Sequence, residues 1–90
     1  MTAGEARAAG RGLVKRSVQV SGHGTSVSLE DEFWYEIRRL AALEGVSLAA
    51  LIGRVDRERG GANLSSALRL HVLRSLKADR LADAERASEA

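Results

Sequence analysis

The sequence contains no cysteine and no proline among its 90 residues. Without cysteine the chain forms neither a disulfide framework nor a thiolate metal site, which suits a reducing cytoplasm. Its two histidines, His23 and His71, do not have the spacing of a metal-ligand cluster. We therefore expect a cytoplasmic protein that holds no metal and no cofactor.

Long hydrophobic runs and aromatic side chains are also scarce. No apolar run approaches the ~20 residues that a membrane-spanning helix needs, and the first residues lack the hydrophobic segment of a signal peptide. Aromatic residues make up 3% of a chain that is 44% hydrophobic, so its core must consist mainly of Leu, Val, Ile and Ala. Nucleotide-binding glycine fingerprints, nucleophile elbows and zinc motifs are absent as well. We therefore expect that the protein is not an enzyme.

A chain of 90 residues suits one domain. Residues 1–12 are rich in Ala, Gly and Arg without a sustained period, and we interpret them as a disordered basic arm. Residues 13–77 carry periodic apolar patterns and form the predicted domain. Residues 78–90 favour a helix but are polar, so a frayed or disordered tail is expected there.

The clearest pattern begins at Thr25. Thr25, Val27 and Leu29 alternate with serines, which is the period of a half-buried strand. The period then becomes helical, and a first helix is predicted over residues 30–44, with acidic residues in its first turn, where they complement the helix dipole. Gly45 ends this helix, and Ser47 is the expected N-cap of a second helix over residues 48–59.

Apolar residues at helical spacing predict both of these helices. The stripe of the first helix is Phe33, Ile37, Leu40 and Ala41, and that of the second is Leu48, Leu51, Ile52 and Val55. Trp34 and Tyr35 lie off the first stripe. We expect Trp34 to pack against a partner chain or a third helix, and Tyr35 to be more exposed.

A third helix is predicted after the break at Gly60 and Gly61, with Asn63 as its cap. Its expected buried side consists of Leu64, Ala67, Leu68, Val72, Leu73 and Leu76. His71 flanks this side, and we interpret it as a partly satisfied core histidine. This helix would pack on the core of a dimer and enlarge the interface.

A second strand is a candidate over residues 13–20, because Val18 and Val20 alternate with Ser17 and Gln19. Turn-forming residues 21–24 would join it to the next strand as a hairpin with a four-residue loop. In the simplest register Val18 lies opposite Val27, and both polar rows face one side. The alternative is an extended arm that becomes ordered only on DNA.

The strand at Thr25–Leu29 has no partner within the stretch of Thr25–Val55, and an exposed strand edge invites another strand. That stretch is also shorter than the ~40 residues below which chains usually need metals, disulfides or oligomerisation. Pairing with an identical chain is the remaining solution. Two copies would form an antiparallel ribbon over a four-helix core.

These residues resemble a known family. A strand, a helix, a Gly-x-Ser turn and a second helix are the signature of ribbon-helix-helix DNA-binding proteins of the Arc/MetJ type. Three further features resemble a bacterial subgroup of small single-domain members: the run from His23 to Glu30, the Phe33–Trp34 pair and the run from Asn63 to Ala67. The resemblance implies a mainly α fold with a short β-ribbon, organised as an intertwined homodimer with an extra C-terminal helix.

The resemblance also implies a site on DNA. Ser26, Ser28 and the residue at position 24 would contact base edges in the major groove, where hydroxyl groups donate and accept hydrogen bonds. Position 24 is Gly24 here, where related proteins often have a long basic residue. Lys15, Arg16, Ser17 or Gln19 would then supply the missing contacts. The alternative is that Ser26 and Ser28 are only the solvated face of the strand.

The start of the second helix is the expected phosphate contact, through the Ser47 hydroxyl and the backbone N–H of Leu48. Charge placement agrees with a polyanionic partner. Residues 1–24 have four basic side chains against one acidic, a net charge of +3, whereas residues 30–44 have a net charge of −3. A solvated tail with ordinary charge scatter is the alternative.

The sequence thus predicts a sequence-specific DNA-binding protein that acts as a homodimer on double-stranded DNA, and specifically a transcriptional repressor. Higher assembly on DNA is compatible with this prediction. Two alternatives remain: an antitoxin whose tail at residues 78–90 folds on a toxin, and an interaction module that binds protein rather than DNA.

Overall fold

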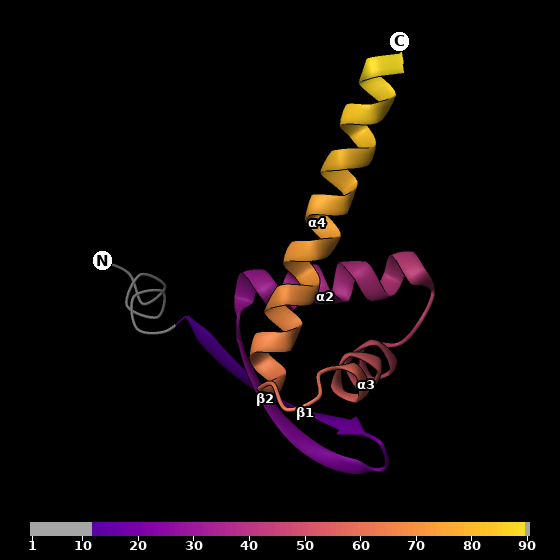
Figure 1. Cartoon of the computed structure of the whole chain (residues 1–90). Coiled ribbons are helices and arrows are strands. Elements are labelled where there is room, and N and C mark those ends of the chain that lie inside the picture. Colours follow the sequence, from indigo (N-terminus) through magenta and orange to yellow (C-terminus); the bar gives the residue numbers. More distant parts are fainter. Residues whose placement is uncertain (1–11, 90) are drawn as a thin grey trace, which may run out of the picture.

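The computed structural model describes residues 12–89. The expected basic arm therefore lies, apart from Gly12, outside the described residues. The chain forms a two-stranded sheet followed by three helices (Figure 1): β1 (Leu13–Val20), β2 (His23–Glu30), α2 (Asp31–Glu44), α3 (Leu48–Glu58) and α4 (Leu64–Glu89). None of the helices within residues 12–89 has both the length and the apolar character that a membrane span requires.

The strands form an antiparallel hairpin within one chain, which confirms the second strand predicted over residues 13–20. The turn is shorter than predicted and consists of Ser21 and Gly22, with φ values of 53° and 86°. Positive φ at both residues is what a two-residue type I′ turn requires. This turn sets Val18 opposite Thr25 rather than opposite Val27. Because the shift is two residues, every side chain keeps its predicted face.

The hairpin gives β2 a strand partner along one of its two edges. β2 pairs along its length with β1 of the same chain, so its backbone does not require a second molecule on that edge. At Ser28 the strand receives another hydrogen bond from its own chain, because the Ser65 Oγ in α4 donates to the Ser28 carbonyl oxygen at 3.0 Å. Residues 12–89 form no third strand, so the other edge of β2 lacks a strand partner within this chain, and the expected homodimer stays a prediction.

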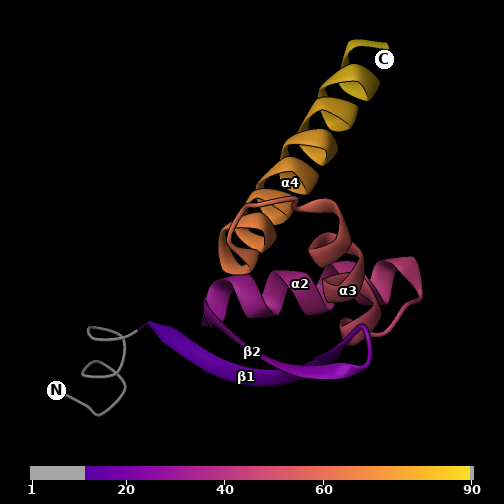
Figure 2. The ribbon, with the colours of Figure 1, turned by 60° about the horizontal axis from the view of Figure 1, so that its bottom comes forward.

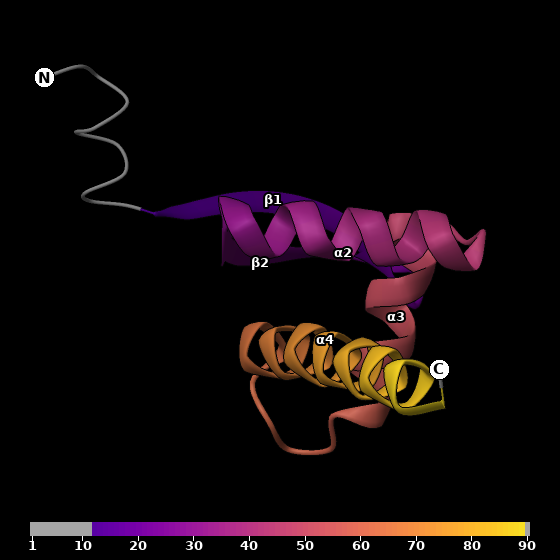
Figure 3. The same ribbon diagram turned by 90° about the horizontal axis from the view of Figure 1, so that it is seen from above.

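The helices cover one face of the hairpin and leave the other open (Figure 2). Seen from above, α2 lies along the hairpin (Figure 3). The side chains that are buried between these layers come from both strands and all three helices: Val20, Val27, Leu29, Trp34, Ile37, Leu40, Ala41, Leu51, Ile52, Val55, Leu68 and Val72. As predicted, this core is aliphatic except for one aromatic residue.

That aromatic residue is Trp34, which was expected to contact a partner chain or the third helix. Its side chain is fully buried in the cluster that also contains Leu68 and Val72 of α4, and its indole Nε1 donates to the Val14 carbonyl oxygen at 2.8 Å. Trp34 therefore joins α2 to β1. Tyr35, the next residue, is 60% exposed, as expected.

The helix ends follow the predicted local chemistry. Gly45 has a φ of 73°, and the amides of Gly45 and Val46 donate to the carbonyls of Ala42 and Ala41 (3.1 and 3.0 Å). This is the Schellman pattern that closes a helix. The Ser47 Oγ accepts from the Ala50 amide at 3.0 Å, and the Asn63 Oδ1 accepts from the Ser66 amide at 3.1 Å. Both are side-chain caps at the N-terminus of a helix.

α4 differs from expectation in length and burial. It continues as helix to Glu89, where a frayed tail was predicted from residue 78. Leu68 and Val72 are buried as predicted, but Leu73 is 49% and Leu76 is 42% exposed. The reason is geometric, because α4 is a straight helix that leaves the other elements beyond its first turns (Figure 1).

Candidate nucleic-acid interface

The open face of the hairpin gathers most of the residues that the sequence predicted for DNA contact. Side chains alternate between the two faces of a strand, and the observed register places three cross-strand pairs on the open face: Lys15 with Ser28, Ser17 with Ser26, and Gln19 with Gly24. Ser28 is partly exposed and the others are exposed. We call these six residues the polar face.

The glycine at position 24 is the departure from the family pattern, and its neighbour on β1 is Gln19. A Cβ built on Gly24 would lie in ordinary contact with the Gln19 Nε2, at 3.6 Å, so the Gln19 amide lies beside position 24 on the polar face. The sequence indicated Gln19 as one of four possible substitutes. The register identifies it as the cross-strand neighbour of Gly24.

Arg16 lies on the opposite face, because it shares a register position with buried Val27. Its guanidinium lies 5.5 Å from the centre of the Trp34 ring, within the range of a cation–π contact. The structure therefore separates Arg16 from the polar face, although the sequence grouped it with Lys15, Ser17 and Gln19.

The start of α3 presents the second predicted contact. Ser47 is exposed and Leu48 is partly buried against the core. The Ser47 Oγ bonds the Ala50 amide and the Ser47 carbonyl bonds the Leu51 amide, so the amides of Leu48 and Ala49 precede the helical ladder. Two N–H groups at the positive end of a helix suit an anion such as a phosphate. The phosphate contact through the Leu48 backbone stays a prediction.

An ion pair neutralises the acidic residue at the open end of the hairpin. Arg69 of α4 makes two hydrogen bonds to the Glu30 carboxylate, at 2.9 and 3.2 Å. These bonds lower the pKa of Glu30. The same guanidinium lies 5.8 Å from the centre of the Phe33 ring. The negative charge beside the polar face is thus held by a cation from α4.

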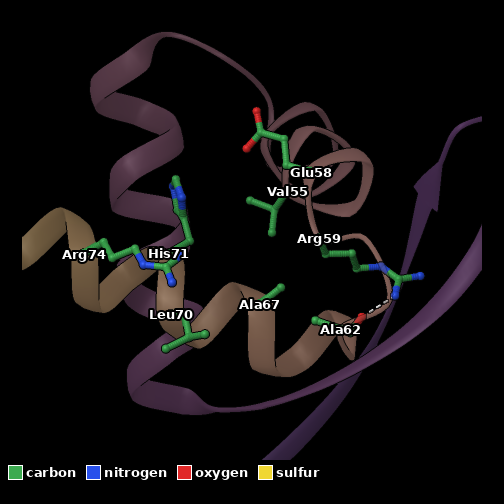
Figure 4. A pocket seen from close by; sticks show the side chains of 8 residues that line it. All are labelled: Val55, Glu58, Arg59, Ala62, Ala67, Leu70, His71 and Arg74. Atoms are coloured by element: carbon green, nitrogen blue, oxygen red, sulfur yellow. Dashed lines mark hydrogen bonds between the residues drawn. The ribbon is translucent and has the colours of Figure 1, made fainter.

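A pocket of about 230 Å³ lies between α3 and α4 (Figure 4), away from the polar face. Its lining residues are Val55, Glu58, Arg59, Ala62, Ala67, Leu70, His71 and Arg74. Within the described residues, the buried His71 Nε2 has no hydrogen-bond partner. Residues 12–89 also contain no group of three potential metal ligands.

A β-strand followed by two helices that a Gly-x-Ser turn joins, here β2, α2 and α3, is the arrangement of the ribbon-helix-helix class. Residues 13–76 match the family described as a ribbon-helix-helix domain, and the chain belongs to this family. It adds α4 as an extra C-terminal helix. The family consists of DNA-binding regulators that are not enzymes, antitoxins among them.

A solved structure is also similar, that of an uncharacterized protein from Bordetella pertussis Tohama I, with 33% sequence identity and a TM-score of 0.68. The alignment covers 78% of this chain and 60% of that one, so the chain spans less than two thirds of its neighbour's length. No curated protein matches this chain.

Proposed function

We propose that the protein is a sequence-specific DNA-binding protein, a transcriptional repressor, that acts as a homodimer and inserts its β-ribbon into the major groove. The observation that supports this most strongly is the polar face, on which six exposed or partly exposed residues lie in cross-strand register. Two paired strands suit the ~12 Å width of the major groove. Hydroxyl, amide and ammonium groups are the donors and acceptors that base edges require.

Contacts with the DNA backbone would hold the ribbon in place. The amides of Leu48 and Ala49 and the hydroxyl of Ser47 would bind one phosphate, since phosphate contacts fix orientation while base contacts specify sequence. Arg7 and Arg11 lie outside the described residues, and from their charge alone they would add contacts that do not depend on sequence.

The homodimer is part of the proposal, because the second edge of β2 has no strand partner among residues 12–89. A two-fold dimer would join two copies of β2 at that edge, and the operator would then be pseudo-palindromic. The apolar surface for association is available on α4, where Leu70, Leu73 and Leu76 are between 42% and 49% exposed.

The test replaces both Ser26 and Ser28 by Ala and measures binding to a selected operator and to random duplex DNA by fluorescence anisotropy across a salt series. Each lost base contact should weaken operator binding by roughly 1–3 kcal/mol, while binding to random duplex stays nearly unchanged. For the wild type, binding to random duplex should weaken steeply as salt rises, because phosphate contacts release counterions.

Tyr35→Ala is the matched control, because Tyr35 is exposed on α2 and not on the ribbon. Unchanged operator binding by the double serine variant would contradict recognition by the ribbon. Binding that does not respond to salt would contradict a DNA-binding function altogether.

A further inference from the structure

The pocket between α3 and α4 is lined by one side of each helix (Figure 4). Its lining residues on α4 recur three and four positions apart, so they share one side of that helix: Ala67, Leu70, His71 and Arg74. Val55, Glu58 and Arg59 have the same spacing on α3. The pocket has a volume of about 230 Å³. Because a water molecule takes ~30 Å³ of liquid, this volume suits a ligand of roughly eight non-hydrogen atoms.

Arg59 has its charge neutralised by a neighbour on α3. Its Nε donates to the Asp56 carboxylate at 2.7 Å, and its guanidinium also donates to the Ala62 carbonyl oxygen. In Figure 4 its side chain points away from the other charged side chains of the pocket. Arg59 therefore closes the pocket without offering a charge to a ligand.

Glu58 and Arg74 supply the remaining charges, one acidic and one basic. Neither makes a hydrogen bond or an ion pair within residues 12–89. The pKa of Arg54 is raised chiefly by its hydrogen bonds to the Glu44 carboxylate, at 2.8 and 3.0 Å, and to a smaller extent by Glu58. Arg54 is thus engaged with Glu44. A ligand with one positive and one negative group would pair with both Glu58 and Arg74.

His71 adds a buried nitrogen that lacks a partner. Within the described part of the chain its Nε2 makes no hydrogen bond, and a buried polar atom of this kind costs free energy until it is paired. His71 lies three positions before Arg74 on the side of α4 that lines the pocket. A carboxylate can accept from an imidazole N–H and a guanidinium at once, because both of its oxygens are acceptors. The negative group of the ligand therefore belongs beside α4.

We propose that this pocket binds an aliphatic α-amino acid as its zwitterion. Arg74 and the Nε2–H of His71 would bind the carboxylate, and Glu58 would bind the ammonium group. The aliphatic side chain would contact Val55 and Ala67. A ligand with a single charge would leave either Glu58 or Arg74 without its partner. The proposal does not depend on DNA binding, because the pocket lies away from the polar face.

The experiment titrates the ¹⁵N-labelled full chain with L-valine, whose size fits the pocket. Saturable changes in amide signals are expected at residues 55–59 and 67–74, with residues 15–19 unchanged. Isovalerate lacks the ammonium group of valine, and isobutylamine lacks its carboxylate. Each should bind about tenfold more weakly or worse, because each loses one charge-assisted hydrogen bond.

Two variants remove the charges from the protein instead. Arg74→Met and Glu58→Gln should each weaken the binding of L-valine by about tenfold or more. Both side chains are exposed, so thermal unfolding by circular dichroism should show wild-type stability. Arg57→Met is the matched control, since Arg57 is exposed on α3 and does not line the pocket. It should bind L-valine as the wild type does.

His71→Leu separates a role in binding from a role in folding. The substitution removes a buried nitrogen that has no partner, so it should keep or raise the melting temperature while it weakens the binding of L-valine. A variant that binds L-valine as tightly as the wild type would overturn the assignment of His71.

Two outcomes would overturn the proposal as a whole. If none of the three compounds produced saturable changes at residues 55–59 and 67–74, the pocket would not be a binding site. If isovalerate or isobutylamine bound as tightly as L-valine, the ligand would not be held as a zwitterion. Either result would leave the proposed DNA-binding function intact.

Discussion

Trp34 connects the ribbon to the helices. Its ring is buried, its Nε1 bonds the Val14 carbonyl oxygen, and Arg16 lies over the ring. From the sequence, Trp34 lies beside the apolar stripe of α2. Helical spacing shows which residues of one helix share a face, but it does not show which other elements pack against that helix. Its burial follows from the hairpin folding back over α2, which is a contact between residues 20 positions apart. Periodicity within a segment does not contain that information.

The hydrogen bond and the ring of Trp34 should make separable contributions to the free energy of unfolding. Trp34→Phe keeps an aromatic ring but removes the indole N–H, and it should lower the free energy of unfolding by about 1 kcal/mol. Trp34→Ala removes the ring and should lower it by roughly 3–5 kcal/mol. Urea denaturation checks both values.

Tyr35→Ala, at an exposed neighbouring position, should stay within about 0.5 kcal/mol of the wild type. If Trp34→Phe and Trp34→Ala lowered the free energy of unfolding equally, the ring would not pack as the structure has it.

The residues of the polar face were predictable one by one, because alternation along a strand sets the face of each side chain. The separation of Arg16 from Lys15 follows from the same alternation. What the sequence did not settle was which residues lie opposite one another, since this depends on the length of the turn. Ser21 adopts a positive φ although it is not glycine, so a two-residue turn was not evident from composition.

Among the elements, α4 depends on a small set of contacts at its start. Arg69 bonds Glu30 and lies over Phe33, and the Ser65 hydroxyl bonds the Ser28 carbonyl. Most helix ends lie close to the predicted residues. The signals that predicted them were glycine breaks, cap residues and acidic first turns. The long extension of α4 was not predicted, because its last turns are polar and have no apolar stripe facing the core.

The contact between α4 and β2 should depend on pH. Hydrogen bonds from Arg69 hold the pKa of Glu30 below its ordinary value of 4.5. The lowered pKa of a folded carboxylate means that its stabilising contribution is complete above about pH 4.5 and is lost as the pH falls through the folded-state pKa. The wild type should therefore exceed Arg69→Met in stability at about pH 6, and this difference should narrow below about pH 4.5.

Arg38→Met, at an exposed position of α2, is the matched control and should show no such narrowing. Urea denaturation at several pH values provides the measurement. A difference between wild type and Arg69→Met that stays constant from about pH 6 to about pH 3 would contradict a stabilising ion pair at Glu30.

At the scale of the whole molecule, the structure separates two surfaces. The polar face lies on the open side of the hairpin, and α4 extends away from the hairpin on the other side (Figure 1). Leucines that the sequence placed in the core lie instead on the surface of α4, since a single chain does not supply enough neighbours to cover them. Exposed leucines at helical spacing suit contact with another helix, which is consistent with the proposed homodimer.

Replacing Leu73 and Leu76 by Ser should therefore lower the dimer fraction without unfolding the chain. Both side chains are nearly half exposed, so the loss of stability within one chain is small, whereas an interface loses its apolar contacts. Light scattering coupled to gel filtration measures the dimer fraction over a range of concentrations.

Leu43→Ser is the control, since Leu43 is 69% exposed on α2. A dimer that persists unchanged in the Leu73 and Leu76 variant would show that association uses another surface.

Whether DNA contacts the hairpin is tested most directly by chemical-shift mapping. Uniformly ¹⁵N-labelled protein would be titrated with the selected operator duplex and its amide signals followed. We predict the largest changes at residues 15–19, 24–28 and 47–49, with little change beyond residue 78. Changes concentrated on α4, with the hairpin signals unmoved at saturating DNA, would contradict binding through the ribbon.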